Sequence, residues 1–256
     1  MMTDIAAAPP YADAVPGVPM QKIRSAWRNA LLLSLCAPAA QAGRPMAADD
    51  AAILDPRQCQ LETWTQHSRA QDEYWAVPAC NFGGGWELAA GAGRTRDLQD
   101  SAAMSLALLQ AKTMLRAPQD DGWGLGLVLA DQFRAGSGGR GDLSLNLPLS
   151  VELAGQRAML HANLGWLRQR GRQDQPSPGV QRSWALGLEL AAGERAALTL
   201  EAYGRQRAGS YVQLGARYSL VPGRADIDIG YGDRAGRRGA ERYLAIGLTL
   251  AASLGD

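Results

Sequence analysis

The residues best suited to acid–base chemistry are two histidines, His67 and His161, the only ones in this 256-residue chain. His161 and Asn163 are two residues apart, so on an extended strand they would share one face. Ser144 or Ser150, on the preceding strand, could approach that face, and a serine beside a histidine can act as a nucleophile. Neither serine lies in a hydrolase nucleophile motif. We therefore favour a polar interior pair and expect no enzyme and no catalytic residue.

Cysteines are the second candidate for site chemistry. Cys59 and Cys80 follow the export signal described below, and an exported chain with two cysteines normally forms a disulfide. Metal binding by this pair would require histidines or further cysteines at a fixed spacing, and the sequence has none. We expect a disulfide, no metal and no cofactor.

The two cysteines are symmetric about a turn near Arg69 and Ala70, which would place Trp64 opposite Trp75. The stretch 58–82 can therefore form a disulfide-clasped hairpin that adds two strands to a sheet. A disulfide-bonded plug or a periplasmic extension is equally compatible with this spacing.

Arginines concentrate at the expected strand ends and loops. Guanidinium groups bind phosphate and carboxylate through paired donors, so such loops could hold lipopolysaccharide phosphates or attract anionic solutes. Solvated loops of an arginine-rich chain also collect these residues without binding anything. The candidate anion-binding residues of the outer loops are Arg168, Arg170, Arg172, Arg237 and Arg238.

Residues 20–42 have the composition of a secretory signal. Basic residues begin the stretch, an apolar run covers 30–37, and a small-x-small pattern ends at Ala42. The apolar run is far shorter than the roughly 18 residues that a membrane-spanning helix needs. We expect translation to begin at Met20 and cleavage to follow Ala42, so that 1–42 is an N-terminal extension and a cleaved signal peptide.

Charge excludes one class of partner. Removal of residues 1–42 takes three basic and two acidic side chains from totals of 26 and 25, leaving 23 of each. A nucleic-acid binder needs a basic surplus to neutralise phosphates, so we expect no nucleic-acid partner. We divide the mature chain into a flexible N-terminal segment, 43–57, and a single β-domain, 58–252.

Alternation of apolar and polar residues dominates the β-domain. Every second residue from Leu143 to Leu153 is apolar, which is the period of a strand with two different faces. Pro148 lies within this strand, where a proline removes a ladder hydrogen bond unless it sits at a β-bulge, and this counts against a closed barrel. The pattern recurs between turn residues and predicts ten strands within 83–252, at about 85–94, 102–115, 122–133, 142–153, 157–167, 182–191, 195–205, 210–220, 224–232 and 242–252.

The connections between these strands alternate in length from the third onward, as in a transmembrane barrel with short periplasmic turns and longer outer loops. The faces opposite the apolar ones are rich in glycine and alanine, which suits a crowded barrel interior better than a soluble sandwich. The sequence therefore predicts an all-β fold, a transmembrane antiparallel up-and-down β-barrel of 10–12 strands.

Polar side chains on the inward faces are the candidate lumen residues. Lys112, the only lysine after residue 42, would pair with an inward acid such as Glu152 or set a preference for anions. The predicted lumen residues are Gln110, Lys112, His161, Asn163, Glu189, Glu201, Arg217, Asp226 and Asp228.

With its signal, its alternating strands and the segments Leu-Leu-Gln-Ala-Lys-Thr-Met-Leu at 108–115 and Gly-Trp-Gly-Leu-Gly-Leu-Val-Leu at 122–129, the chain resembles bacterial outer-membrane barrels. Within these it is similar to the broad family of channel proteins linked to phenol-type degradation pathways. The resemblance covers most of 58–252 and lies in pattern. It implies about twelve strands and a passive transport role, with no catalytic residues to carry over.

These features predict a protein exported to the bacterial outer membrane that acts as a passive channel or binding pore for small solutes. A structural barrel with a filled lumen is one alternative, and an outer-membrane lipid hydrolase that uses His161 is another. The expected partners are outer-membrane lipid and lipopolysaccharide, the barrel assembly machinery and small solutes.

Overall fold

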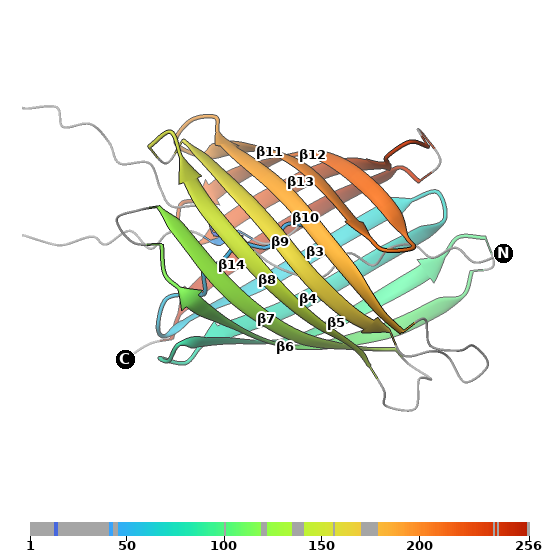
Figure 1. Ribbon diagram of the computed structural model, residues 1–256, viewed down its shortest axis with the longest axis horizontal. Helices are drawn as coiled ribbons and strands as arrows, with labels where there is room; N and C mark the ends of the chain where they lie inside the picture. The colour runs from blue at the N-terminus through green and yellow to red at the C-terminus, as the bar shows by residue number, and fades with distance from the viewer. Residues whose placement is uncertain are drawn as a thin grey trace, which may run out of the picture.

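The structure is a computed structural model that describes residues 13–14, 41–42, 46–99, 101–118, 122–134, 141–155, 157–169, 179–237, 239 and 241–254. Twelve of its strands close into one antiparallel barrel (Figure 1). Two further strands, β1 (Asp13–Ala14) and β2 (Gln41–Ala42), pair only with each other. Among the residues described, no helix is long and apolar enough to cross a membrane.

Each barrel strand pairs with its neighbours in chain order, and β14 pairs with β3 to close the wall. The hairpin of 58–82 therefore supplies two of the twelve strands, and the predicted barrel fold is confirmed with the higher of the expected counts. The strands are β3 (Gln58–Ser68), β4 (Gln71–Asn81), β5 (Trp86–Asp97), β6 (Ala103–Arg116), β7 (Trp123–Arg134), β8 (Asp142–Leu153), β9 (Ala158–Gln169), β10 (Gly179–Ala191), β11 (Ala196–Arg205), β12 (Gly209–Val221), β13 (Ala225–Arg234) and β14 (Tyr243–Ser253).

Burial follows the sequence alternation and shows which face of each strand points outward. Leu186 on β10 and Leu214 on β12 are 50% and 62% exposed, whereas their neighbours Ala185 and Gln213 are buried. Apolar side chains thus cover the outside of the wall. A closed barrel with this outer surface satisfies its backbone hydrogen bonds internally and can face lipid.

Pro148 lies on the inward face of β8 and interrupts the ladder without a bulge. The pairing of β7 with β8 runs from Trp123 opposite Val151 to Leu125 opposite Leu149, and resumes in the same register at Val128 opposite Asn146. The ladder therefore omits two pairs at this proline and continues without a bulge. Register shifts occur instead between Met114 and Arg116 on β6 and between Ser219 and Val221 on β12.

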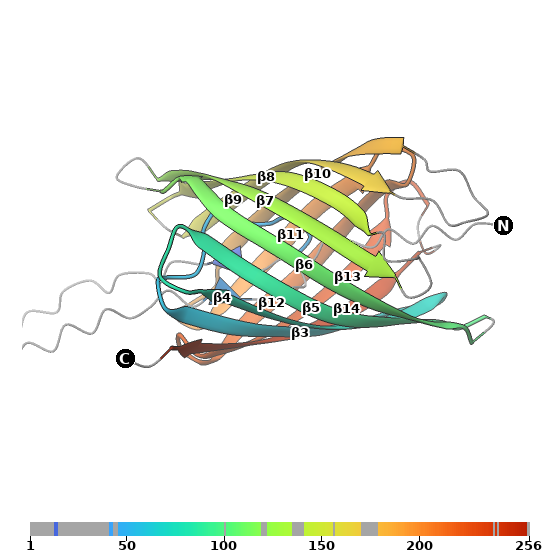
Figure 2. The ribbon, with the colours of Figure 1, turned by 90° about the horizontal axis from the view of Figure 1, so that it is seen from below.

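Both ends of the barrel-forming chain lie at one end of the barrel (Figure 2). The connections at that end are 82–85, 117–122, 154–157, 192–195 and 222–224, and the opposite end holds the longer connections 135–141, 170–178 and 235–242. The predicted asymmetry therefore holds for these loops. It fails for β11 to β12, which are joined by the short stretch 206–208.

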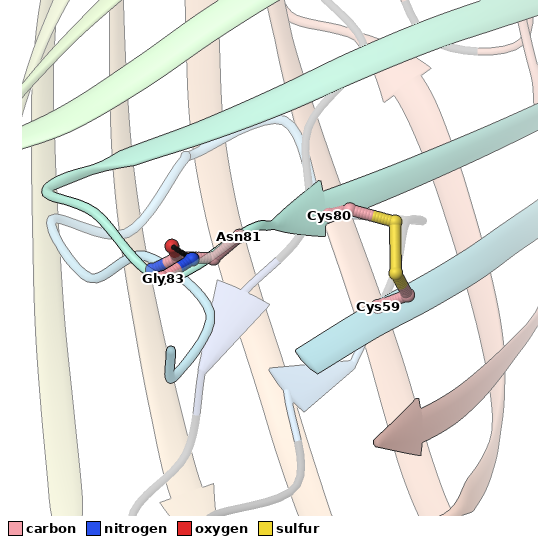
Figure 3. Close-up of a disulfide and its surroundings, with 4 residues drawn as sticks. All are labelled: Cys59, Cys80, Asn81 and Gly83. Atoms are coloured by element: carbon pink, nitrogen blue, oxygen red, sulfur yellow. Dashed lines mark hydrogen bonds between the residues drawn. A yellow bond between two sulfur atoms is a disulfide. The ribbon is translucent and has the colours of Figure 1, made fainter. Parts of the chain in front are cut away.

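The Cys59–Cys80 disulfide joins the ends of β3 and β4 close to the chain termini of the barrel (Figure 3). The two cysteines face each other in the ladder, as do Trp64 and Trp75. The predicted disulfide and hairpin register are both confirmed.

Large aromatic rings fill part of the interior. Trp64 and Trp75 are buried and stack with ring centroids 5.8 Å apart. Gly93 lies beside them, and a Cβ atom at this position would come within 2.5 Å of the Trp75 ring. A Cβ atom at Gly232 would likewise overlap the Tyr243 ring. These inward glycines make room for aromatic side chains rather than for an open pore.

Candidate functional site

The predicted lumen residues all lie inside the barrel wall. Their side chains come from six strands, β6 and β9 to β13, and none is more than 8% exposed. The buried set is Gln110, Lys112, His161, Asn163, Glu189, Glu201, Arg217, Asp226 and Asp228. The interior of the barrel is therefore the candidate site.

Residues 46–54, which we call the inner segment, occupy this interior (Figure 2). We expected 43–57 to be flexible, but Met46, Ala48, Asp49 and Leu54 are each at most 2% exposed. The segment has no regular secondary structure and leads through 55–57 into β3. It follows that the chain folds back into its own barrel before the first barrel strand begins.

Lys112 on β6 is the main electrostatic contact of the inner segment. Its Nζ lies 3.2 Å from Asp49 Oδ1 and 2.5 Å from Asp50 Oδ1, and all three side chains are buried. We expected Lys112 to pair with an inward acid, and it does, but the acids belong to the inner segment instead of being Glu152 on β8. Two carboxylates thus share one buried ammonium group.

Asn163 on β9 binds the main chain of Asp49 at both of its polar groups. The Asp49 N–H donates to Asn163 Oδ1 at 2.6 Å, and Asn163 Nδ2 donates to the Asp49 carbonyl oxygen at 2.7 Å. One amide side chain therefore replaces the two hydrogen bonds that a neighbouring strand would provide.

Ser150 on β8 and His161 on β9 do form the pair that the sequence suggests, with Oγ 2.9 Å from Nδ1. The inner segment covers this pair, because the Ala51 N–H donates to the same Ser150 Oγ at 2.9 Å. His161 is fully buried. A substrate could not reach the serine in this arrangement, so the contacts describe a structural pair.

The inner segment leaves the lumen beside the disulfide. The Leu54 N–H donates to Glu87 Oε2 at 2.8 Å, and Asn81 Nδ2 donates to the Leu54 carbonyl oxygen at 2.7 Å. Asn81 Oδ1 also accepts from the Gly83 N–H at 3.0 Å (Figure 3). Asn81 therefore ties the segment to the β4–β5 turn.

A second charged centre surrounds Arg217 on β12. Its guanidinium donates to Glu189 Oε2 and to Asp228 Oδ1, both at 2.8 Å. Nearby, Gln213 donates to Glu201 Oε2 at 2.9 Å, and Glu201 Oε1 accepts from the Ala48 N–H at 2.7 Å. The inner segment thus contacts the Gln213–Glu201 pair through its own backbone.

Acidic side chains dominate the buried charges. Among the residues described, ten buried acids stand against two buried bases, Lys112 and Arg217. Within the part of the chain that the structure describes, no group of three or more His, Cys, Asp or Glu side chains could hold a metal ion.

The predicted outer-loop arginines are only partly covered by the structure. Arg168 and Arg237 are exposed and lie at the end opposite the chain termini of the barrel. Arg170, Arg172 and Arg238 lie outside the described residues. Two other arginines of this end, Arg134 and Arg234, form ion pairs with Asp142 and Glu241.

Several site residues escaped the sequence reasoning. Glu87 could have been found, because it lies between Trp86 and Leu88 on a strand whose apolar face was recognised. Asp49 and Asp50 carried no usable signal, since the inner segment has no periodicity and its partners are distant along the chain.

Residues 30–252 match a protein family described as Uncharacterised conserved protein UCP029691. The chain belongs to this family. A comparison with curated proteins found no match.

Many solved structures share the fold of this family member. The COG4313 outer membrane channel from Pseudomonas putida F1 aligns with a TM-score of 0.57 and 10% identity, over 79% of this chain and 98% of that one. A NanC porin aligns at 0.55 with 13% identity, over 74% and 98% of the two chains. A KdgM porin in complex with disordered oligogalacturonate aligns at 0.54 with 6% identity, over 75% and 98%. At such identities the likeness establishes a shared barrel fold.

Proposed function

We propose that this protein is an outer-membrane channel for small solutes whose lumen is closed by the inner segment. The observation that carries the proposal is the inner segment itself, which is buried in the barrel and held by Lys112 and Asn163. A barrel built only for structure could fill its interior with wall side chains. Here a segment outside the barrel strands is bound through polar contacts, as expected of an occupant that can leave the lumen.

The apolar outer surface supports an outer-membrane position, and a signal peptide ending at Ala42 would supply the export route. Assembly in that membrane would require the barrel assembly machinery. The exposed Arg168 and Arg237 would contact lipopolysaccharide phosphates at the outer rim. The link to phenol-type degradation stays a prediction about the solute.

Single-channel recording in planar bilayers tests the channel. We expect the wild-type protein to conduct little and a variant lacking residues 46–54 to conduct steadily, because the deletion removes the buried occupant of the lumen. A heat-dependent shift in gel mobility verifies that the variant has folded. Arg195→Met, which changes an exposed side chain in the 192–195 turn, is the matched control and should behave as wild type.

A filled structural barrel is the second candidate, favoured by the stacked Trp64 and Trp75 and by the buried Tyr203, Tyr211 and Tyr243. A folded deletion variant that never conducts would exclude the channel and leave this candidate.

A further inference from the structure

The wall of the lumen recognises the inner segment mainly by its backbone. Side chains of five strands contact main-chain atoms of the segment, and these are Asn81 on β4, Glu87 on β5, Ser150 on β8, Asn163 on β9 and Glu201 on β11. Four of them accept N–H groups and two donate to carbonyl oxygens. Such contacts are available to any peptide of similar conformation, because every residue other than proline carries the same donor and acceptor.

Small residues of the wall limit the side chains that fit at particular positions. A Cβ atom at Gly187 on β10 would lie 2.8 Å from Ala48 Cβ, and one at Gly126 on β7 would lie 3.0 Å from the Ala51 carbonyl oxygen. The occupant therefore passes close to the wall at Ala48 through its Cβ atom and at Ala51 through its backbone. The site therefore accepts alanine or a similarly small residue at position 48, where the side chain itself meets the wall, and it encloses the small Ala51 side chain, which is 1% exposed.

Lys112 adds a charge requirement between these two small positions. It pairs with Asp49 and Asp50, both at least 97% buried. At the far end Leu54 packs into the apolar cluster that contains Trp64 and Val77. The lumen thus combines backbone hydrogen bonds, two points where the occupant lies close to a wall glycine, one ammonium group and one apolar subsite, in a fixed order along the occupant.

We propose that the lumen is a binding site for oligopeptides that carry small residues around an adjacent pair of carboxylates, and that the inner segment is its resident ligand. This inference deepens the proposed function, since it names the class of ligand that the same lumen takes. It does not require the barrel to conduct.

The experiment uses the full chain, folded before it is cut. A specific protease site inserted between Pro56 and Arg57, both exposed, allows the inner segment to be separated from the finished barrel. Gel filtration in detergent followed by mass spectrometry then shows whether the released peptide stays in the barrel. Fluorescence anisotropy measures binding of a labelled peptide with the sequence of residues 43–56.

We expect either retention of the cut peptide or saturable binding of the labelled one, and no binding to uncut protein, whose tethered segment outcompetes a free peptide. Asn163→Leu and Lys112→Met should each weaken binding at least tenfold, whereas Arg195→Met should not. A peptide N-methylated at the position of Asp49 should also bind at least tenfold more weakly, because it lacks the N–H that donates to Asn163.

Two results would overturn the inference. One is loss of the cut peptide from a barrel that then binds no labelled peptide. The other is binding of the chain's own sequence but not of an unrelated peptide with the same pattern of small and acidic residues, which would indicate a dedicated plug. Since these measurements are made in detergent, they stand apart from the bilayer recordings, and either proposal can fail alone.

Discussion

Lys112 holds two carboxylates of the inner segment in a part of the lumen that is closed to solvent. The pair keeps the segment in one register because both carboxylates converge on one nitrogen. Breaking a buried ion pair by removing one partner costs about 3 to 5 kcal/mol, since the remaining charge stays buried without compensation.

Lys112→Met should therefore loosen the inner segment and leave the barrel wall intact. Hydrogen exchange in micelles measures this directly, and we expect the amides of Ala48, Asp49 and Ala51 to exchange faster. Arg195→Met serves as the control. Unchanged protection of these amides in the Lys112 variant would show that the ion pairs do not hold the segment.

Gly93 shows how one small residue permits a large neighbour. Alanine at this position would place Cβ 2.5 Å from the Trp75 ring, and the stacked Trp64 limits how far that ring can move. Overpacking of this kind costs about 1 to 3 kcal/mol. We expect Gly93→Ala to lower the urea midpoint of unfolding in lipid vesicles. Gly84→Ala, where a Cβ atom would meet nothing within 4 Å, should leave the midpoint unchanged.

The β3–β4 hairpin is the element in which local sequence and covalent chemistry agree. Its ladder places Cys59 opposite Cys80, 21 residues apart, at the open end of the hairpin. A disulfide there removes freedom from the unfolded chain by closing the loop, which for a loop of this size is worth about 3 kcal/mol.

Replacing both cysteines with serine should lower the free energy of unfolding by about that amount and keep the twelve-stranded barrel. Urea titration of the double variant, with and without reductant, checks this value. Reductant should affect wild type but not the variant. Equal stability of oxidised wild type and the variant would mean that the pairing of β3 with β4 and with β14 holds the hairpin closed without the disulfide.

At the scale of the whole molecule, the lumen carries an excess of negative charge. Removing the inner segment takes Asp49 and Asp50 with it and leaves eight buried acids against two buried bases among the described residues. Rings of acidic side chains favour cations in a pore. The outer-rim arginines alone would favour anions, so the two regions of the barrel predict opposite selectivities.

We expect the lumen to decide, because its charged side chains are buried whereas Arg168 and Arg237 are exposed to solvent. The variant lacking 46–54 should therefore show a reversal potential that indicates preference for potassium over chloride. Arg168→Ala with Arg237→Ala in the same background should change this preference little. A reversal potential that indicates preference for chloride would show that the arginines of the rim, and not the acids of the lumen, set the ion selectivity.

The strands, their inward and outward faces and the hairpin register could be predicted from the amino-acid sequence, because alternation and a symmetric cysteine pair are local signals. The sequence also assigned the polar residues to the faces that the structure buries, since a period of two leaves no third orientation. Inward glycines signalled a crowded interior, but not the rings that they accommodate.

The occupant of the lumen becomes visible only in the folded chain. The contacts of the inner segment with Lys112 and Asn163 join residues 62 to 114 positions apart, and its sequence has no period that would announce them. Closure was also a tertiary matter, because β3 pairs with β14 across the whole length of the domain. A short aperiodic segment is predicted to be flexible, because its sequence contains no sign of its hydrogen-bond partners. Here those partners come from strands that meet only when the barrel has closed.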